Sequence, residues 1–280
     1  MENLSDAQVK ELKQIANNIR KSIIEMLSIA GSGHTGGALG MTDIFTLLYF
    51  HTLKHNPMEK FWPHRDRLVL SNGHICPVLY TAMSYSGYFP KVELKTLRKF
   101  GTRLQGHPHR EYMPFLETSS GPLGSGLSQA VGMAIADRID MGMKTIYAML
   151  SDGEHDEGNT WEAIMLANKE HLSNLIVIVD RNNIQIDGPT DKIMPLGDLK
   201  SKYESFGWFA QDVDGHDFRE LNNAIHNAKN NKTSPSVIVA HTIPGKGVKE
   251  WENDYHWHGK APTKVEAEMA IEELKNIIIR

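Results

Sequence analysis

The hydrophobic positions along the chain change several times between the spacing of a helix and the spacing of a strand. The first segment carries apolar residues three or four positions apart, which places them on one face of a helix. These residues are Val9, Leu12, Ile15, Ala16, Ile19, Ile23 and Leu27. Glycine is a normal helix stop, so the pattern predicts a first helix that ends at Gly31, followed by a glycine-rich loop.

Short apolar runs then alternate with further helical stretches. Strands are predicted at 68–70, 145–150, 175–180, 209–213 and 236–240. Helices are predicted at 42–53, 77–86, 126–143, 159–169, 217–230 and 264–279. The runs LIVIVD and SVIVA are continuously apolar, as expected of strands buried on both sides. The alternation predicts right-handed βαβ units and an α/β fold, a doubly wound, mostly parallel sheet with helices on both faces.

Length and composition exclude several classes of protein. At 280 residues the chain has room for one large α/β domain or for two smaller ones. Its 30 basic and 34 acidic side chains leave a net charge of −4, which argues against a general nucleic-acid binder. No run of about 18 uncharged apolar residues is present to cross a membrane. The polar N-terminus and the single cysteine, Cys76, suggest neither a secretory signal nor a disulfide framework, so a cytoplasmic location is predicted.

Polar residues follow two of the predicted strands at the point where each strand ends. Asp152 comes after the strand 145–150, and Asn182 comes after the strand 175–180. The two residues are 182 − 152 = 30 positions apart, which is enough for one crossover helix. If the strands are neighbours, a carboxylate and a carboxamide oxygen meet at the carboxyl edge of the sheet, where ligands bind in such folds.

These two oxygens would suit a hard cation. Mg²⁺ and Ca²⁺ prefer oxygen ligands, and Mg²⁺ commonly combines one or two protein carboxylates with the phosphates of a bound ligand. Gly153 would let the backbone approach such an anion closely. An ordinary turn at the end of a strand also favours Asp, Gly and Asn, so the spacing alone leaves both interpretations open.

Histidine is abundant, and several histidines stand beside a glycine. The chain has 14 histidines, and four of them form such pairs in predicted loops. The pairs are Gly33-His34, Gly73-His74, Gly106-His107 and His258-Gly259. Imidazoles can hydrogen-bond to anionic oxygens and transfer protons near neutral pH, so four pairs favour an active site. Any one pair could equally be a satisfied surface or core residue, and the spacing is not that of zinc ligands on one helix.

A glycine-rich run, GPLGSG at 121–126, leads directly into a predicted helix. Glycines allow a ligand to approach the backbone, and the N-terminus of a helix favours anions. A flexible connection that ends in a glycine N-cap also explains the run. A second run, GSGHTG at 31–36, matches the dinucleotide-binding pattern letter by letter, but it follows a helix rather than a strand and lacks that context.

Together these segments resemble the N-terminal, diphosphate-binding half of transketolase. Seven blocks occur in the family's order and cover nearly the whole chain. They are GSGHTGGALG (31–40), SNGH (71–74), GHP (106–108), SSGPLGSGLSQAVGMA (119–134), SDGEHDEG (151–158), VDRNNIQIDG (179–188) and WHGKAP (257–262). The resemblance implies a single domain over residues 1–280 that binds thiamine diphosphate through Mg²⁺ or Ca²⁺.

The resemblance also assigns contacts to individual residues. The family's metal ligands fall on Asp152, Asn182 and the backbone carbonyl of Ile184. Gly153 and His74 would contact the diphosphate. Asn182 would belong to both the metal site and the cofactor site.

Further positions match the family's cofactor pocket and active site. Gly121 and Leu123 would lie beside the cofactor, with their backbone groups available for hydrogen bonds. His34, His107 and His258 look like the family's active-site histidines, which orient substrate oxygens and transfer protons. His258 would also lie near the diphosphate.

One further acidic residue matches the family's pattern, and three positions carry residues that differ from it. Glu157 matches an acid at the interface between subunits that couples paired sites, although an acid in the first turn of a helix is also favoured by the helix dipole. Ser151 replaces the first glycine of the usual G-D-G, and Thr35 replaces a commoner proline. Pro244 stands where some relatives carry a lysine near the diphosphate, which places that cationic contact in doubt and leaves Lys246 as a possible substitute.

The resemblance implies one subunit of a two-chain transketolase, which transfers a two-carbon ketol unit from a ketose phosphate or related ketose to an aldose. The family's pyrimidine-binding and C-terminal domains, with the catalytic glutamate, would be on a partner chain in an α₂β₂-type assembly. Two alternatives stay open. One is a non-catalytic, regulatory thiamine diphosphate-binding subunit. The other is a subunit of a different thiamine diphosphate enzyme, similar to deoxyxylulose-phosphate synthase or to 2-oxoacid dehydrogenase.

Overall fold

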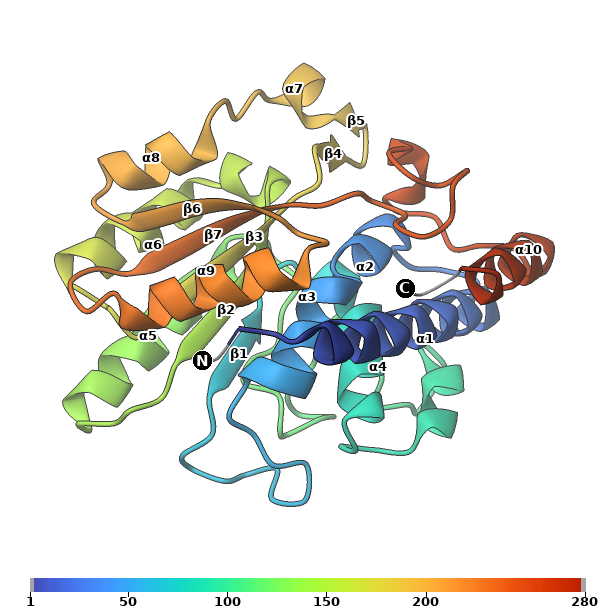
Figure 1. Ribbon diagram of the computed structural model, residues 1–280, viewed down its shortest axis with the longest axis horizontal. Helices are drawn as coiled ribbons and strands as arrows, with labels where there is room; N and C mark the ends of the chain where they lie inside the picture. The colour runs from blue at the N-terminus through green and yellow to red at the C-terminus, as the bar shows by residue number, and fades with distance from the viewer. Residues whose placement is uncertain (1–2, 278–280) are drawn as a thin grey trace.

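Five strands pair side by side in the computed structural model, which describes residues 3–277 (Figure 1). They form one sheet in the order β1-β2-β3-β7-β6, and every neighbouring pair of strands is parallel. The strands are β1 (Arg67–Leu70), β2 (Ile146–Ser151), β3 (Leu175–Arg181), β6 (Phe209–Asp214) and β7 (Ser236–His241). A short antiparallel hairpin, β4 (Ile184–Gln185) with β5 (Gly188–Pro189), stands apart from this sheet.

Helices cover both faces of the sheet. The α-helices of the described residues are α1 (Asp6–Ala30), α2 (Gly36–Gly40), α3 (Thr42–Leu47), α4 (Cys76–Tyr85), α5 (Ser125–Ile139), α6 (Gly158–Lys169), α7 (Thr190–Ile193), α8 (Leu199–Ser205), α9 (Phe218–Asn230) and α10 (Lys264–Lys275). Helix α7 contacts the hairpin of β4 and β5 instead of the sheet. One apolar cluster joins α1, α3, α4, α9 and α10 to one face, and a second joins α5, α6 and α8 to the other. In Figure 1, α1 and α9 lie on the viewer's side of the sheet.

The central strand β3 shows how one run of residues serves both faces. Ile176 and Ile178 belong to the first apolar cluster, whereas Val177 and Val179 belong to the second. Side chains alternate along a strand, so a continuously apolar run is what a strand buried on both sides requires. The prediction of a doubly wound α/β fold is therefore confirmed.

The ends of α1 follow the signals in the sequence. Ser5 caps the helix by accepting a hydrogen bond from the backbone N–H of Gln8, whose side chain accepts one from the backbone of Ser5 in return. At the other end, Gly31 has a φ of 69°, and its N–H donates to the carbonyl of Leu27. The predicted helix stop at Gly31 is confirmed, because the left-handed conformation there is one that glycine adopts without strain.

The glycine-rich segment after α1 is partly helical, which differs from the predicted loop. Gly36, Gly37 and Gly40 are buried within α2. A Cβ atom at Gly37 would lie 2.8 Å from the side chain of Ile75, and one at Gly40 would lie 3.1 Å from the carbonyl oxygen of Ile243. Close packing against other segments therefore outweighs the low intrinsic helix propensity of glycine.

Several boundaries also differ from the predictions. The helix predicted at 42–53 divides into α3 and a wider π-helical turn, Leu48–Thr52. Helix α5 ends at Ile139 rather than at residue 143, because the buried carboxylate of Asp137 accepts the N–H of Lys144 and folds the chain into a turn. The helix predicted at 264–279 ends at Lys275, and residues 278 and 279 lie outside the described part of the chain.

The parallel arrangement brings the carboxyl ends of all five strands to the same edge of the sheet. In the register of β2 with β3, Ser151 stands opposite Asp180, and Asp180 stands opposite Ala240 of β7. The segments that leave β1, β2, β3 and β7 therefore start from one rim. This is the position at which ligands bind in open α/β sheets.

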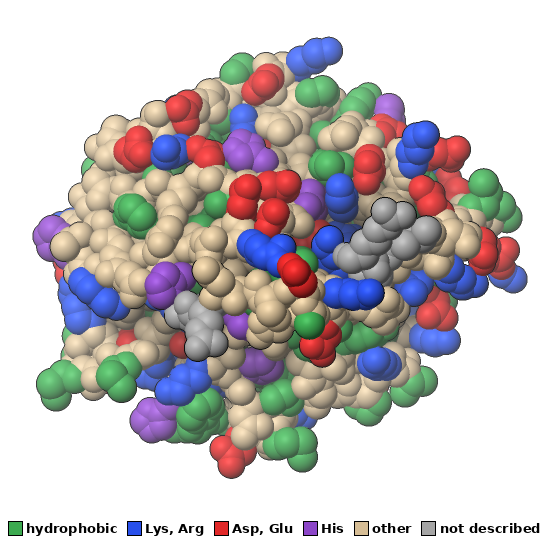
Figure 2. All heavy atoms as spheres, in the orientation of Figure 1, with side chains coloured by type: hydrophobic (Ala, Val, Ile, Leu, Met, Phe, Trp, Pro, Cys, Tyr) green, Lys and Arg blue, Asp and Glu red, His purple; other side chains and the backbone are tan. Residues whose placement is uncertain are grey.

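The surface carries no single large field of one charge on the face shown in Figure 2, where basic and acidic side chains are interspersed. Of the helices in residues 3–277, none combines the length and apolar character needed to cross a bilayer.

The alternating burial of β3 makes a stability prediction. Ile178→Ala removes a side chain that is fully buried at the centre of the sheet, so the free energy of unfolding should fall by about 2–5 kcal/mol in urea denaturation. Met143→Ala is the control, because Met143 is 93% exposed and its truncation should change the value by less than about 0.5 kcal/mol. Equal effects of the two substitutions would contradict this description of the core.

Candidate active site

A cavity of about 300 Å³ opens at the carboxyl edge of the sheet. Segments that are far apart in the sequence meet around it. The lining residues are His34, His74, His107, Gly121, Leu123, Ser151, Asp152, Gly153, Asn182, Ile184, Gln185, Ile186 and His258. Every site residue predicted from the sequence lines this cavity except Glu157.

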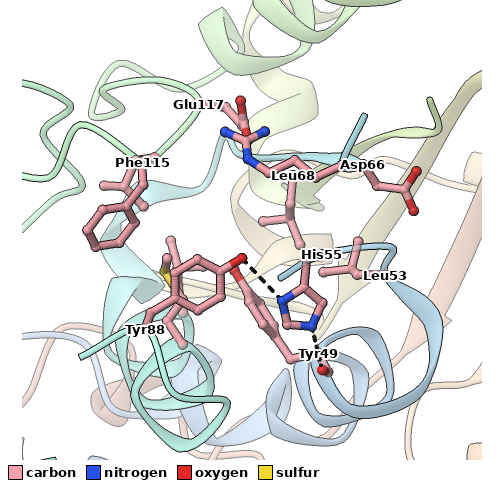
Figure 3. A pocket seen from close by; sticks show the side chains of 12 residues that line it. Tyr49, Leu53, His55, Asp66, Leu68, Tyr88, Phe115 and Glu117 are labelled. Atoms are coloured by element: carbon pink, nitrogen blue, oxygen red, sulfur yellow. Dashed lines mark hydrogen bonds and ion pairs between the residues drawn. The ribbon is translucent and has the colours of Figure 1, made fainter. Parts of the chain in front are cut away.

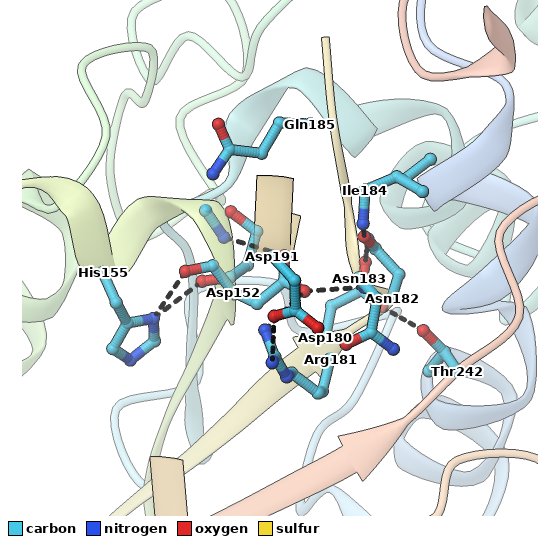
Figure 4. Close-up of polar contacts among 12 residues, drawn as sticks. Asp152, His155, Asp180, Arg181, Asn182, Asn183, Ile184, Gln185, Asp191 and Thr242 are labelled. Carbon is cyan, nitrogen blue, oxygen red and sulfur yellow. Dashed lines mark hydrogen bonds and ion pairs between the residues drawn. The ribbon is translucent and has the colours of Figure 1, made fainter. Parts of the chain in front are cut away.

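The carboxylate of Asp152 connects the end of β2 to the segment after β3. Asp152 is 1% exposed, and its Oδ2 atom accepts the backbone N–H of Asn183 at 2.7 Å (Figure 4). Its Oδ1 atom accepts the N–H of Gly153, also at 2.7 Å. The sequence predicts that Asp152 and Asn182 meet if β2 and β3 are neighbours, and the structure brings their segments into direct contact.

The carboxamide of Asn182 has a defined orientation. Its nitrogen donates to Oδ2 of Asp180 at 2.8 Å, and its oxygen accepts the N–H of Ile184 at 3.0 Å. Because a backbone N–H can only donate, the oxygen of Asn182 must be the atom that faces Ile184. Asp152, Asn182 and Ile184 therefore offer carboxylate, amide and backbone carbonyl oxygens around one part of the cavity.

The charges in this region fit a divalent cation. Burial raises the pKa of Asp152 to about 6. Burial also raises the pKa of Asp180 to about 7, and the nearby Asp152 adds to this shift. Arg181 offsets part of the charge, with Nη1 3.3 Å from Oδ2 of Asp152. A bound cation would stabilise both ionised carboxylates, and the oxygen donors are those that Mg²⁺ or Ca²⁺ prefers.

The described residues form no zinc-type site. Among residues 3–277, no three His, Cys, Asp or Glu side chains are arranged to hold a metal ion. The mixed set of one carboxylate, one amide and one carbonyl leaves coordination positions that the phosphates of a bound cofactor would have to complete.

Sequence reasoning missed His155, which supports the turn that carries Asp152. Its Nδ1 lies 3.0 Å from the carbonyl oxygen of Ser151 and 3.1 Å from that of Asp152 (Figure 4). Its Nε2 lies 2.8 Å from the hydroxyl of Tyr203. Carbonyl oxygens only accept, so Nδ1 carries the proton and Nε2 accepts from Tyr203. Burial lowers the pKa of His155 to about 4, which keeps this neutral form in place.

Four histidines surround the other end of the cavity. The ring centre of His34 lies 5.0 Å from that of His74, 6.5 Å from that of His107 and 5.7 Å from that of His258. The rings of His74 and His258 are 5.2 Å apart. The structure thus brings together the histidines of all four glycine–histidine pairs.

These histidines are neutral near pH 7. Burial, with smaller contributions from His258, Arg98 and His107, lowers the pKa of His34 to about 4. Burial also lowers the pKa of His74, His107 and His258. A neutral imidazole has one N–H donor and one acceptor nitrogen, so each can donate a hydrogen bond to a ligand oxygen or accept the proton of a ligand hydroxyl. The Nδ1 atom of His34 is buried with no protein partner, as expected of a group that faces a ligand.

Local packing holds the histidine segments together. Gly33 has a φ of 139°, and a Cβ atom there would lie 2.4 Å from the side chain of Leu27. The hydroxyl of Thr35 donates to the carbonyl oxygen of Lys260, 225 positions away. The rings of Trp251 and Trp257 stack with centres 4.0 Å apart and support the turn that carries His258.

Glu157 and Lys246 lie away from the cavity. Glu157 is exposed at the N-cap position of α6, and its side chain makes no capping hydrogen bond. Lys246 lines a separate hollow with Arg20 and Asp43, so it does not substitute for the cationic contact that Pro244 lacks. Pro244 packs beside Gly36, two positions after His34 in the sequence.

Another polar hollow, between α4 and β1, is closed by its own side chains. His55 contacts the hydroxyl of Tyr88 at 3.1 Å and the carbonyl oxygen of Tyr49 at 2.9 Å (Figure 3). Arg65 pairs with Glu117 at 2.7 Å. The volume of about 30 Å³ would admit one water molecule, so this hollow is a packing feature rather than a substrate site.

Comparison with known proteins connects this geometry to one family. Residues 11–276 match the domain family described as transketolase, thiamine diphosphate binding domain. The chain is 41% identical over 272 residues to the 6-deoxy-6-sulfo-D-fructose transketolase subunit SqwG of Clostridium sp. (strain MSTE9), covering 97% of this chain and 98% of that protein. It is 34% identical to one subunit of the apulose-4-phosphate transketolase of Phocaeicola vulgatus, covering 97% of this chain and 96% of that subunit.

Longer proteins match over only part of their length. Transketolase of Rattus norvegicus is 37% identical over 95% of this chain but 42% of its own length. The crystal structure of transketolase from Campylobacter jejuni superposes with a TM-score of 0.88 at 35% identity, over 96% of this chain and 44% of that one. The chain therefore spans nearly the full length of relatives named as subunits and less than half of these longer transketolases.

The lowered pKa of His34 makes a stability prediction. The folded protein keeps His34 neutral down to about pH 4, whereas the unfolded chain takes up a proton below about pH 6.5, so acid favours unfolding through this residue. Between pH 6.5 and 4, wild type should lose stability relative to His34→Asn, with a slope approaching about 1.4 kcal/mol per pH unit. Urea denaturation of both proteins at several pH values measures this difference, and a pH-independent difference would refute the assignment.

Proposed function

This chain belongs to the transketolase family through its thiamine diphosphate-binding domain, and we propose on that premise that it is the N-terminal subunit of a two-chain transketolase. The match to two named subunits over 96% and 98% of their lengths supports a separate subunit. The observation that carries the proposal is the meeting of Asp152 with the Asn182 segment at the end of a cavity that also holds four histidines.

The proposed reaction moves a two-carbon ketol unit from a ketose to an aldose. Thiamine diphosphate, when bound, would supply the nucleophilic carbon that makes cleavage and formation of the sugar's carbon–carbon bond possible. Asp152, the amide oxygen of Asn182 and the carbonyl oxygen of Ile184 would hold Mg²⁺, and through it the diphosphate. Gly153 and His74 would contact the diphosphate, with Gly121 and Leu123 beside the cofactor.

The chain's histidines would hydrogen-bond to the oxygen atoms of the substrate. His34, His107 and His258 come from three separate segments, so they can approach a sugar from different sides. Because they are neutral, each can hydrogen-bond to a sugar hydroxyl and accept the proton of that hydroxyl. Such general acid–base catalysis contributes roughly 10²–10⁴-fold to a reaction rate. The removal of water by the surrounding loops would strengthen these polar contacts.

A partner chain and the substrate class complete the proposal. The two relatives named as subunits act, by their names, on a sulfonated fructose and on apulose 4-phosphate. We infer that this chain's substrate is likewise a ketose with an anionic end, and that a partner chain provides the rest of the active site. The proposal that Glu157 contacts such a partner is supported by its exposure and by its position outside the cavity. The α₂β₂ assembly and the cytoplasmic location stay predictions from the sequence.

The metal assignment is tested at Asp152. Asp152→Ala removes the carboxylate ligand, so calorimetry on the chain with its partner should show that Mg²⁺ no longer strengthens thiamine diphosphate binding. Asp140→Ala, at the exposed end of α5, is the matched control and should retain the wild-type Mg²⁺ dependence. An unchanged affinity in Asp152→Ala would rule out this ligand.

The requirement for a partner chain is tested by measuring ketol transfer with and without that chain. The purified chain with thiamine diphosphate, Mg²⁺, a ketose phosphate or sulfonate and an aldose should give no ketol transfer, because the proposed catalytic glutamate belongs to the partner. Addition of a candidate partner chain should restore transfer, measured by chromatography of the sugar products. Robust transfer by the chain alone would overturn the two-chain proposal.

A further inference from the structure

A buried carboxylate, Glu154, lies where three cavity-forming segments meet. The residue is 0% exposed, although it stands only two positions after Asp152. Its side chain does not face the cavity, because Glu154 is not among the lining residues. A fully buried carboxylate is costly unless hydrogen bonds compensate for the lost water, so the contacts of this side chain require an explanation.

Three donors from three segments satisfy the carboxylate. Oε1 accepts from the hydroxyl of Ser71 and from the backbone N–H of Gly124, and Oε2 accepts from the N–H of Ser151 at 3.2 Å. Ser71 follows β1, Gly124 precedes α5, and Ser151 ends β2. The same segments continue into His74, Gly121 with Leu123, and Asp152. One side chain therefore fixes the relative positions of three parts of the cavity wall.

The N-terminus of α5 is occupied by these same groups. Gly124 is the N-cap residue, and the N–H of Gly126 donates to the hydroxyl oxygen of Ser71 at 3.1 Å. The partial positive charge of a helix N-terminus favours an anion, and here the anion is the protein's own Glu154. The glycine-rich run at 121–126 thus ends on an internal carboxylate instead of leaving this helix end free for a ligand phosphate.

Close packing leaves little freedom around this network. Gly124 has a φ of 80°, and a Cβ atom there would lie 1.9 Å from the side-chain oxygen of Asn159. A Cβ atom at Gly126 would lie 2.5 Å from Ser71. The loop can therefore approach Glu154 only with glycine at both positions, and a shift of the loop would break the hydrogen bonds.

We propose that Glu154 is a positioning residue that locks the segments carrying His74, Gly121 and Asp152 into the arrangement that receives thiamine diphosphate, an inference that rests on the proposed function. A carboxylate is required because all three neighbours are donors. The isosteric glutamine has one acceptor oxygen, and its amide N–H groups would face another donor.

The test is Glu154→Gln in the chain assembled with its partner. Thiamine diphosphate affinity at fixed Mg²⁺, measured by fluorescence titration, should fall about tenfold or more, as expected when a buried donor loses its partner. The value of kcat at saturating cofactor should change much less, because Glu154 touches neither cofactor nor substrate. Glu11→Gln, the same change at an exposed position of α1, should leave both values at the wild-type level.

A second measurement needs neither cofactor nor activity. Amide hydrogen exchange on the full chain should be faster at Gly124 and Gly126 in Glu154→Gln, with unchanged exchange in β3. Wild-type affinity and wild-type exchange in a folded Glu154→Gln protein would overturn the proposal. If that variant does not fold, Ser71→Ala tests the proposal instead. It removes one hydrogen-bond donor to Glu154 and should lower the affinity for thiamine diphosphate. An unchanged affinity would overturn the positioning role of Glu154. A wild-type protein that binds no thiamine diphosphate but shows the exchange contrast would refute the proposed function rather than the network.

Discussion

Two carboxylates, Asp152 and Asp180, are buried where the carboxyl ends of β2 and β3 meet, and the site is arranged around this negative charge. Neutral donors, namely backbone N–H groups, the Asn182 amide and the Thr242 hydroxyl, surround the two groups, and Arg181 is the cation in contact with Asp152. Burial of like charges is unfavourable without a counter-charge. The parallel sheet creates this situation, because it brings both strand ends to one rim.

Behind the cavity wall, a second group of residues maintains the geometry without facing the cavity. His155 holds two carbonyl groups of the Asp152 turn, and Glu154 holds the N–H and O–H groups of three segments. The two residues are adjacent in sequence and use opposite hydrogen-bonding capacities, one as donor and one as acceptor. Support of this kind determines how precisely the groups in front can be placed.

Much of the fold could be predicted from local patterns in the sequence, whereas the positions of Gly121, Leu123 and Ile184 in the cavity were expected only from the resemblance to transketolase. Continuous aliphatic runs identify strands buried on both sides, and polar residues directly after such runs lie at the rim. The contact between His155 and Tyr203 could not be predicted, because α8 is a seven-residue helix with no strong periodic signal. The helical course of α2 was also missed, because packing against Ile75 and Ile243 decides it rather than propensity. No spacing rule points to Glu154, whose partners belong to three separate segments.

The hydrogen bond between Thr35 and Lys260 joins the first and last parts of the cavity wall across 225 positions of sequence. During synthesis on the ribosome, the segment with His34 emerges long before the segment with His258 exists. The nascent chain therefore carries an open half-cavity until the segment around His258 has been made, and the apolar surfaces that α10 later covers stay exposed for that time. The contact between Thr35 and Lys260 closes a long loop, and it can form only after both of its segments have been made.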